Sequence, residues 1–269
     1  MVEGIWTLQK RVRPAAVAGT FYPGDAGALR EMVRTLIDAA RSDAPAPKAM
    51  IVPHAGYIYS GPVAASAYAR LLNRAQPITR VVLLGPDHRV GFRGLAIPTV
   101  DDFDTPLGRV PLDRKALERI GRLAGVVSFD RGHAQEHSLE VHLPFLQTVL
   151  DGFQLVPVVV SNATAEQVAA VLDVLWGGPE TLIVVSSDLS HFHDHATAQR
   201  LDTATSDAIS HLQGERLTGE DACGYLPIRG LLLAAAARGL TVTTIDQRNS
   251  GDTAGACDRV VGYGAYVVP

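Results

Sequence analysis

Three apolar stretches of the sequence end on side chains that bind metals or carry protons. His54 ends the first stretch, His88 ends the second, and Asp188 with His191 ends the third. The carboxyl ends of buried strands are where ligand sites assemble in α/β folds, so the three ends predict one shared crevice. Imidazoles beside a carboxylate are suited to metal binding or to proton transfer.

His54 and His88 are the candidate metal ligands of this crevice. Taken singly, a histidine at a strand end is more often a hydrogen-bonded structural residue than a ligand. The metal interpretation depends on convergence, because the two residues follow successive strands. If those strands are neighbours in the sheet, their ends lie about 5 Å apart.

Cys223 is a candidate third ligand. It lies just before a predicted helix over residues 227–238, whose free amide groups and dipole favour a thiolate. The alternative is a small buried cysteine that fills space. Nothing assigns a role to Cys257, the other cysteine. Two cysteines are too few for a disulfide scaffold and fit a reducing cytoplasm.

Asp188 and His191 share one loop and form a candidate proton-handling pair. The carboxylate is able to orient the imidazole, or the imidazole acts as a general base beside a metal. The alternative is a solvated loop, since His193 and His195 follow at once.

The segment over residues 135–144 is also rich in functional side chains. Glu136, His137 and His142 are candidates for the wall of a substrate pocket, and Tyr57 is a fourth. A capping role at a helix start is the alternative for Glu136. Tyr57, with Tyr59 and Phe103, is also a candidate for an aromatic wall against a bound partner, although such residues are more often ordinary core.

The elements that position these residues alternate between buried strands and amphipathic helices. This alternation predicts a single three-layer α/β/α domain over residues 1–269, with a largely parallel or mixed central sheet. The predicted strands are residues 49–53, 80–84, 153–160, 182–186, 240–245 and 260–268. The predicted helices follow Asp25 and Thr164 and cover residues 62–72, 196–212 and 227–238.

Composition excludes several classes of protein. With 47% hydrophobic and 19% charged residues, the chain is able to bury a large core. The formal net charge of -4 comes without any basic block, which argues against nucleic acid or an anionic membrane as a partner. Residues 231–237, the most apolar stretch, are far shorter than a membrane span of about 20 residues. We expect a cytoplasmic protein with a small-molecule or peptide partner.

Six short segments, in order along nearly the whole chain, resemble those of a known family. They are Ala-Gly-Thr-Phe-Tyr-Pro (18–23), Pro-His-Ala-Gly-Tyr-Ile-Tyr-Ser-Gly (53–61), Gly-Pro-Asp-His (85–88), Glu-His-Ser-Leu-Glu-Val-His-Leu-Pro (136–144), Ser-Ser-Asp-Leu-Ser-His (186–191) and Cys-Gly (223–224). The chain is similar in these segments to the MEMO family, whose prokaryotic members are called protein B of the AmmeMemoRadiSam system. The His-Ala-Gly-Tyr block that starts at His54 is specific.

The resemblance implies a fold related to class III extradiol dioxygenases. His54 and His88 match the metal histidines of those enzymes, and Cys223 falls where they carry a glutamate ligand. His191 matches their acid/base histidine, and Asp188 accompanies it. The resemblance implies Fe(II) as the expected metal. A thiolate is softer than a carboxylate and favours Zn, Cu(I) or a differently tuned Fe, so Zn and Cu are the alternatives.

Three functions follow as expectations. The first is a non-haem, metal-dependent oxidoreductase that acts on a small substrate, and the second is a zinc-type hydrolase. The third is a non-catalytic module that binds a peptide or protein. By the resemblance, the partners of such a module are a radical-SAM protein and an AMMECR-type protein.

Overall fold

The computed structural model describes residues 10–269, so the first nine residues of the predicted domain lie outside the described residues. Nine strands form its main sheet: β2 (Ala49–Val52), β3 (Arg80–Pro86), β4 (Gly94–Ile97), β7 (Val126–Ser128), β8 (Gln154–Ser161), β9 (Thr181–Ser186), β10 (His191–His193), β11 (Thr243–Asn249) and β12 (Val260–Val268). Their order is β10-β12-β2-β9-β3-β8-β4-β7, and β11 pairs with β12. A small second sheet holds β1 (Val12–Arg13), β5 (Asp102–Phe103) and β6 (Val110–Pro111).

The four central strands β2, β9, β3 and β8 run parallel, while β12 and β4 flank them in the antiparallel direction. The parallel strands are nearly continuous runs of buried valine, leucine and isoleucine. Such runs are expected where helices cover both faces of a sheet.

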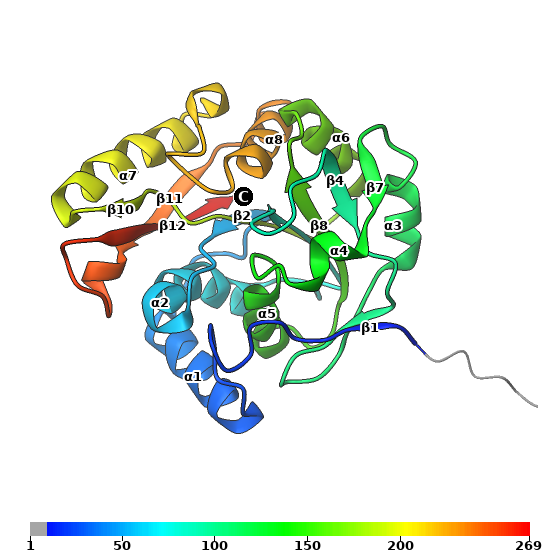
Figure 1. The fold of residues 1–269 in the computed structure, drawn as a ribbon, viewed down its shortest axis with the longest axis horizontal. Coiled ribbons are helices and arrows are strands. Elements are labelled where there is room, and N and C mark those ends of the chain that lie inside the picture. Colours follow the sequence, from blue (N-terminus) through cyan, green and yellow to red (C-terminus); the bar gives the residue numbers. More distant parts are fainter. Residues whose placement is uncertain (1–9) are drawn as a thin grey trace, which may run out of the picture.

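Helices lie on both sides of the main sheet, as Figure 1 shows. The helices of the described chain are α1 (Ala26–Ala39), α2 (Tyr57–Tyr68), α3 (Arg114–Ile120), α4 (Asp130–Ala134), α5 (Leu143–Val149), α6 (Ala165–Leu175), α7 (His195–Ser210) and α8 (Tyr225–Ala236). Helices α1, α2 and α5 pack together on one side, and α6 packs with α8 on the other. The predicted three-layer α/β/α architecture with a mixed sheet is confirmed.

Local sequence explains several helix starts. The carboxylate of Asp25 accepts the N–H of Ala28 at the start of α1. Thr164 and Gln167 form a reciprocal capping box at the start of α6. These side chains satisfy amide groups that the first turn of a helix leaves without partners.

The predicted boundaries of two elements were wrong by three residues or more. The strand expected over 240–245 begins at Thr243, because the N–H of Leu240 bonds the carbonyl of Ala235 and closes the end of α8. The helix expected from Pro62 begins at Tyr57, so this proline lies inside α2. Several short elements were not predicted from sequence, namely the strands β1, β4, β5, β6, β7 and β10 and the helices α3, α4 and α5.

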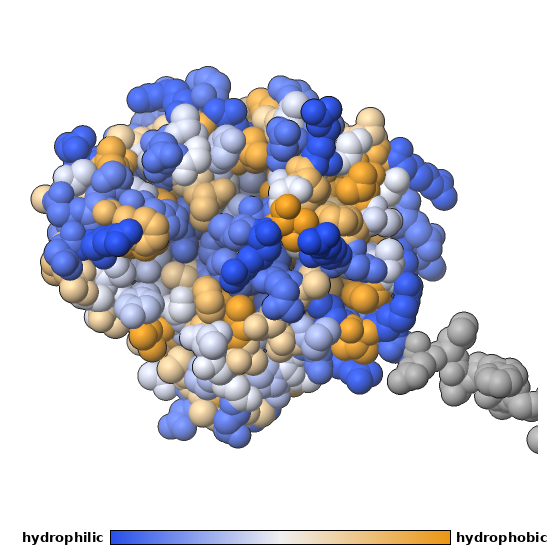
Figure 2. Space-filling view, in the orientation of Figure 1, coloured by the Kyte–Doolittle hydropathy of each residue, from blue (hydrophilic) through white to orange (hydrophobic). Residues whose placement is uncertain are grey.

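Within residues 10–269, no helix is both long enough and apolar enough to cross a membrane. On the face seen in Figure 2, hydrophobic residues lie interspersed among hydrophilic ones. The large hydrophobic side chains that are exposed come from separate elements, namely Ile58, Leu72, Val127, Phe192 and Leu233.

Candidate metal centre

Two histidines and a cysteine from three distant parts of the chain meet at the carboxyl ends of the central strands. Donor atoms of His54, His88 and Cys223 all lie within 4.8 Å of one another. Nε2 of His54 is 3.4 Å from Sγ of Cys223, and the two imidazole centroids are 5.1 Å apart. Two imidazoles and a thiol at this separation fit a transition metal ion, which takes nitrogen and sulfur ligands.

The expectation that His54 and His88 follow neighbouring strands was wrong. Strands β2 and β3, which precede His54 and His88, are not neighbours, because β9 lies between them and pairs with both. The histidines therefore meet through the loops that follow the strands. The end of β9 lies beneath them and contributes Ser186 to the site.

His54 is buried and held by two side chains from β9 and the loop after it. Its main-chain N–H donates to Oδ1 of Asp188 at 2.7 Å, and its Nδ1 is 2.6 Å from Oγ of Ser186. Burial, helped by neighbouring histidines, holds the pKa of His54 well below its ordinary value. The ring is therefore neutral at pH 7 and keeps a lone pair for a metal.

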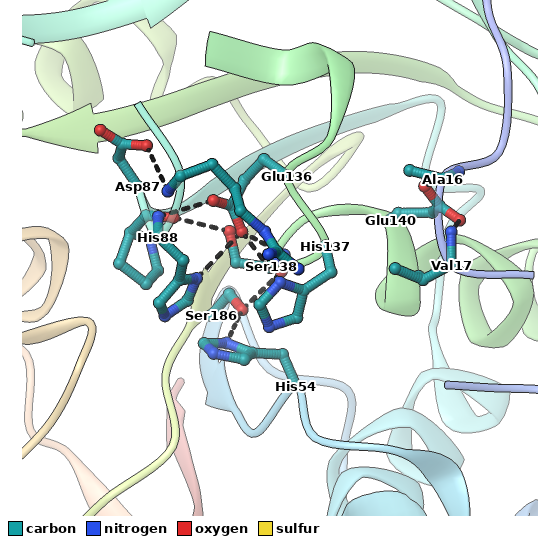
Figure 3. Close-up of polar contacts among 12 residues, drawn as sticks. Ala16, Val17, His54, Asp87, His88, Glu136, His137, Ser138, Glu140 and Ser186 are labelled. Atoms are coloured by element: carbon teal, nitrogen blue, oxygen red, sulfur yellow. Dashed lines mark hydrogen bonds and ion pairs between the residues drawn. The ribbon is translucent and has the colours of Figure 1, made fainter. Parts of the chain in front are cut away.

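His88 is exposed and is held by the buried carboxylate of Glu136, as Figure 3 shows. Its Nδ1 lies 3.0 Å from Oε1 of Glu136, and its main-chain N–H donates to Oε2 at 2.7 Å. Although burial alone would raise it, the hydrogen bonds from His88 bring the pKa of Glu136 down to about 2. An ionised carboxylate only accepts, so Nδ1 of His88 carries hydrogen and Nε2 is free for a metal.

His137 lies against both ligand histidines. Its ring centroid is 4.7 Å from that of His88 and 5.4 Å from that of His54. Nδ1 of His137 is 3.3 Å from Oε1 of Glu136, and this buried nitrogen has no hydrogen-bond partner among the described residues. Together with His88 and Glu136 it forms a second group of donors within 4.8 Å.

Cys223 differs from its predicted state. Its Sγ accepts the main-chain N–H of Asp188 at 3.3 Å, yet burial, added to the nearby Asp188 carboxyl, raises the pKa of Cys223 to about 12. The helix start at Tyr225 lies even nearer to Cys223 than predicted, but burial outweighs the stabilisation of a thiolate expected from it. Without a metal the residue is a thiol, and metal binding would release its proton.

A pocket of about 450 Å³ opens beside the centre. His191, Asp188 and His137 line it, whereas His193 and His195 do not. The other lining residues come from four separate segments: Phe21, Ala55, Gly56, Tyr59, Ser250, Gly255, Ala256, Arg259, Val261 and Tyr263.

Tyr57, His142 and Phe103 lie away from this pocket. The hydroxyl of Tyr57 donates to the carbonyl of Val141, and Nε2 of His142 is 2.8 Å from Oγ of Ser186. Phe103 packs against Arg13 and His133 in the small sheet. All three side chains are buried behind the site or in the core.

The Asp188 carboxylate points to His54 and makes no hydrogen bond to His191 within residues 10–269. Burial raises the pKa of Asp188 above its ordinary value. His191 stands at a backbone irregularity, because Phe192 has a φ of 66° and the pairing of β10 with β12 shifts between His191 and His193. Non-glycine residues in this left-handed region are uncommon and often mark functional sites.

Several residues of the site were not identified from sequence, among them Ser186, Phe21, Arg259 and Tyr263. Ser186 ends a buried strand two residues before Asp188, which is a pattern that could have indicated its place. Phe21 lies in the segment 18–23, to which no chemistry was assigned. Arg259 and Tyr263 carry no local pattern, because only the path of β12 brings them to the pocket.

Comparison with known proteins identifies the family of this chain. The family model described as "Memo-like protein" matches residues 13–267. The chain belongs to the Memo family. A "MEMO1 family protein" of Aquifex aeolicus is 35% identical over 94% of this chain and 97% of its own length. Others from Methanothermobacter thermautotrophicus and Saccharolobus islandicus are 33% and 36% identical, over 94% and 93% of this chain and 98% and 97% of their own lengths.

A solved structure also overlaps this Memo-family chain. The crystal structure of an uncharacterized protein from Escherichia coli K12 covers 80% of this chain and 98% of its own, with a TM-score of 0.46 and 14% identity. The family assignment does not rest on this overlap.

Proposed function

We propose that this Memo-family protein holds one transition metal ion, iron(II), through His54, His88 and Cys223. The observation that carries the proposal is the meeting of three donor atoms from three distant segments within 4.8 Å. Each of the two histidines is held through Nδ1, by Ser186 or Glu136, with Nε2 left free. Partners of this kind orient metal-binding histidines in proteins.

We further propose that the site acts on a small substrate bound in the pocket. When bound, the ion supplies Lewis acidity and one-electron redox chemistry. A cavity of about 450 Å³ is in the range of small-molecule sites. His191, which lines it, takes a proton from a substrate group or returns one at a ring nitrogen. Phe21, Tyr59 and Tyr263 pack against the substrate and limit the entry of water.

Metal analysis of protein purified without a histidine tag tests the first proposal. We expect near-stoichiometric metal in the wild type and in His193→Ala, a control that keeps all three donors. The metal content should drop sharply in His54→Ala and Cys223→Ala. Unchanged metal in both of these variants would contradict the proposal.

Oxygen uptake tests the second proposal. After anaerobic loading with Fe(II), candidate catechols and other reduced aromatics should support uptake in the wild type and in His193→Gln. His191→Gln should lose the activity while keeping its metal. Hydrolysis of esters or amides by the zinc-loaded protein, without oxygen uptake, would favour a hydrolase instead.

A second candidate function is peptide or protein binding by the same pocket. The aromatic lining and Arg259, which stacks on Phe192 at 4.5 Å, favour it, because aromatic and arginine side chains are enriched where proteins bind each other. The proposed partners are a radical-SAM protein and an AMMECR-type protein in the cytoplasm, where two free cysteines would stay reduced. Binding of either partner that survives loss of all three metal ligands would favour this function over catalysis.

A further inference from the structure

The hydroxyl of Ser186 is the common partner of two histidines and a carbonyl. Its Oγ lies 2.6 Å from Nδ1 of His54, 2.8 Å from Nε2 of His142 and 2.6 Å from the main-chain carbonyl oxygen of Ser138. Ser186 ends β9 and is fully buried beneath the metal centre. Figure 3 shows it between His54 and the segment that carries Ser138.

The number of hydrogens on these groups permits one arrangement. A serine hydroxyl has one hydrogen to donate and two lone pairs that accept. The carbonyl of Ser138 only accepts, so at 2.6 Å the single hydrogen of Ser186 must point to it. Both remaining contacts of Oγ must then be donated by the histidines.

This arrangement determines where each ring carries its hydrogen. His54 donates through Nδ1, so its Nε2 has the lone pair and accepts the thiol hydrogen of Cys223, 3.4 Å away. His142 donates through Nε2, so its Nδ1 accepts the hydroxyl of Tyr68 at 2.8 Å. Every polar side-chain atom of Tyr68, His142, Ser186 and His54 then has at least one partner of the right kind.

We propose that Ser186 is the positioning residue that holds His54 as an Nε2 metal ligand, and that His142 and Tyr68 fix the orientation of Ser186. The metal half of this inference rests on the proposed function, whereas the hydrogen positions do not. The two ligand histidines are then held differently, His88 by the carboxylate of Glu136 and His54 by a neutral hydroxyl.

Without Ser186, the Nδ1–H of His54 loses its acceptor in a buried place. The ring then gains from moving its hydrogen to Nε2, where Sγ of Cys223 is able to accept it. That form has no lone pair facing the centre. Ser186→Ala therefore weakens metal binding even though it removes no ligand, and loss of such a partner costs about 10- to 100-fold in affinity.

The first test observes the hydrogens directly. Metal-free protein with ¹⁵N-labelled histidine should show His54, identified by its loss in His54→Asn, with hydrogen on Nδ1. Ser186→Ala should move part or all of that hydrogen to Nε2. A wild-type His54 with hydrogen on Nε2 would overturn the proposal.

The second test measures metal affinity by competition with a chelator. We expect the affinity for iron(II) to fall about 10- to 100-fold in Ser186→Ala. Ser206→Ala is the matched control, since it removes another buried hydroxyl with two partners, on α7. It should destabilise the protein comparably and leave metal affinity unchanged.

If Ser186→Ala does not fold, Tyr68→Phe still tests whether the hydrogen bonds behind His54 affect metal affinity. It removes only the hydroxyl behind His142 and keeps the ring that stacks on Phe145. We expect a smaller loss of affinity, of a few-fold. Equal affinity in all folded variants would overturn the proposal while leaving a metal centre in place. The expected hydrogen positions in a protein that binds no metal would instead overturn the proposed function alone.

Discussion

Two buried glutamates four residues apart, Glu136 and Glu140, have different partners. Glu136 accepts from His88, which is exposed and belongs to the candidate metal centre. Glu140 accepts from Nη1 of Arg13 at 2.6 Å and from the hydroxyl of Tyr22 at 2.6 Å. Figure 3 shows both carboxylates and the main-chain groups of the N-terminal segment near Glu140.

The difference lies in what balances each buried charge. Glu140 faces an arginine, a permanent cation that also donates to the carbonyls of His133 and Glu136. It therefore fastens the N-terminal segment, which carries the pocket residue Phe21, to residues 133–140. Glu136 faces a histidine whose other nitrogen is free to bind a cation. A buried carboxylate therefore stabilises the fold when its partner is an arginine, and orients a candidate metal ligand when its partner is a histidine.

The largest expected effect is a loss of stability when the charge of Glu140 is removed. Glu140→Gln leaves the Arg13 charge buried without its counter-charge, so we expect the free energy of unfolding to fall by about 3–5 kcal/mol. Urea unfolding of metal-free protein measures this loss. The double variant Arg13→Met, Glu140→Gln removes both charges and should recover part of the stability. A double variant less stable than the single one would contradict this account of Glu140.

Glu136→Gln should instead act on metal binding. The amide holds Nδ1–H of His88 less firmly than a carboxylate does, so the affinity for iron(II) should fall about 10- to 100-fold. The unfolding free energy should change less than in Glu140→Gln, because no arginine is left unpaired. Competition titration and urea unfolding of the same two variants give the comparison. A larger loss of affinity in Glu140→Gln than in Glu136→Gln would break it.

The smallest expected effect is on the pH dependence of stability, and it concerns His133, whose carbonyl accepts from Arg13. His133 is buried and donates through Nε2 to the carbonyl of Ala96, and burial lowers its pKa to about 4. The unfolded chain binds this proton with an ordinary pKa of about 6.5. The stability that this difference in pKa contributes is therefore fully present above pH 6.5 and is lost as pH falls toward 4. The loss is about 2 kcal/mol between pH 7 and pH 5.

His133→Gln, which keeps an N–H donor for Ala96, should remove that part of the pH dependence in urea unfolding of metal-free protein. His211→Gln, at an exposed position, is the matched control and should keep the wild-type dependence. Other buried histidines contribute equally to all three proteins. An identical pH dependence in His133→Gln and the wild type would show that His133 is not the group responsible.

Local patterns predicted the central strands and the long helices well, because each depends on periodicity and caps within a few residues. The prediction was poorest for short elements such as β10 and α4, whose ends are decided by contacts with distant strands. The three candidate metal ligands were predicted from sequence, with Cys223 supported by a family resemblance. The position of Glu136 as the partner of His88 was not, since its segment allowed a cap just as well.

By itself the sequence determined which residue types stand at the ends of the buried strands, and hence that His54, His88 and Asp188 share one edge of the sheet. Tertiary structure alone decided the strand order that places β9 between β2 and β3. It also decided that Cys223 is a half-buried thiol and that Ser186 holds His54. The physical reason is that hydrogen-bond partners and desolvation depend on groups more than a hundred residues apart, and no local pattern encodes their distance.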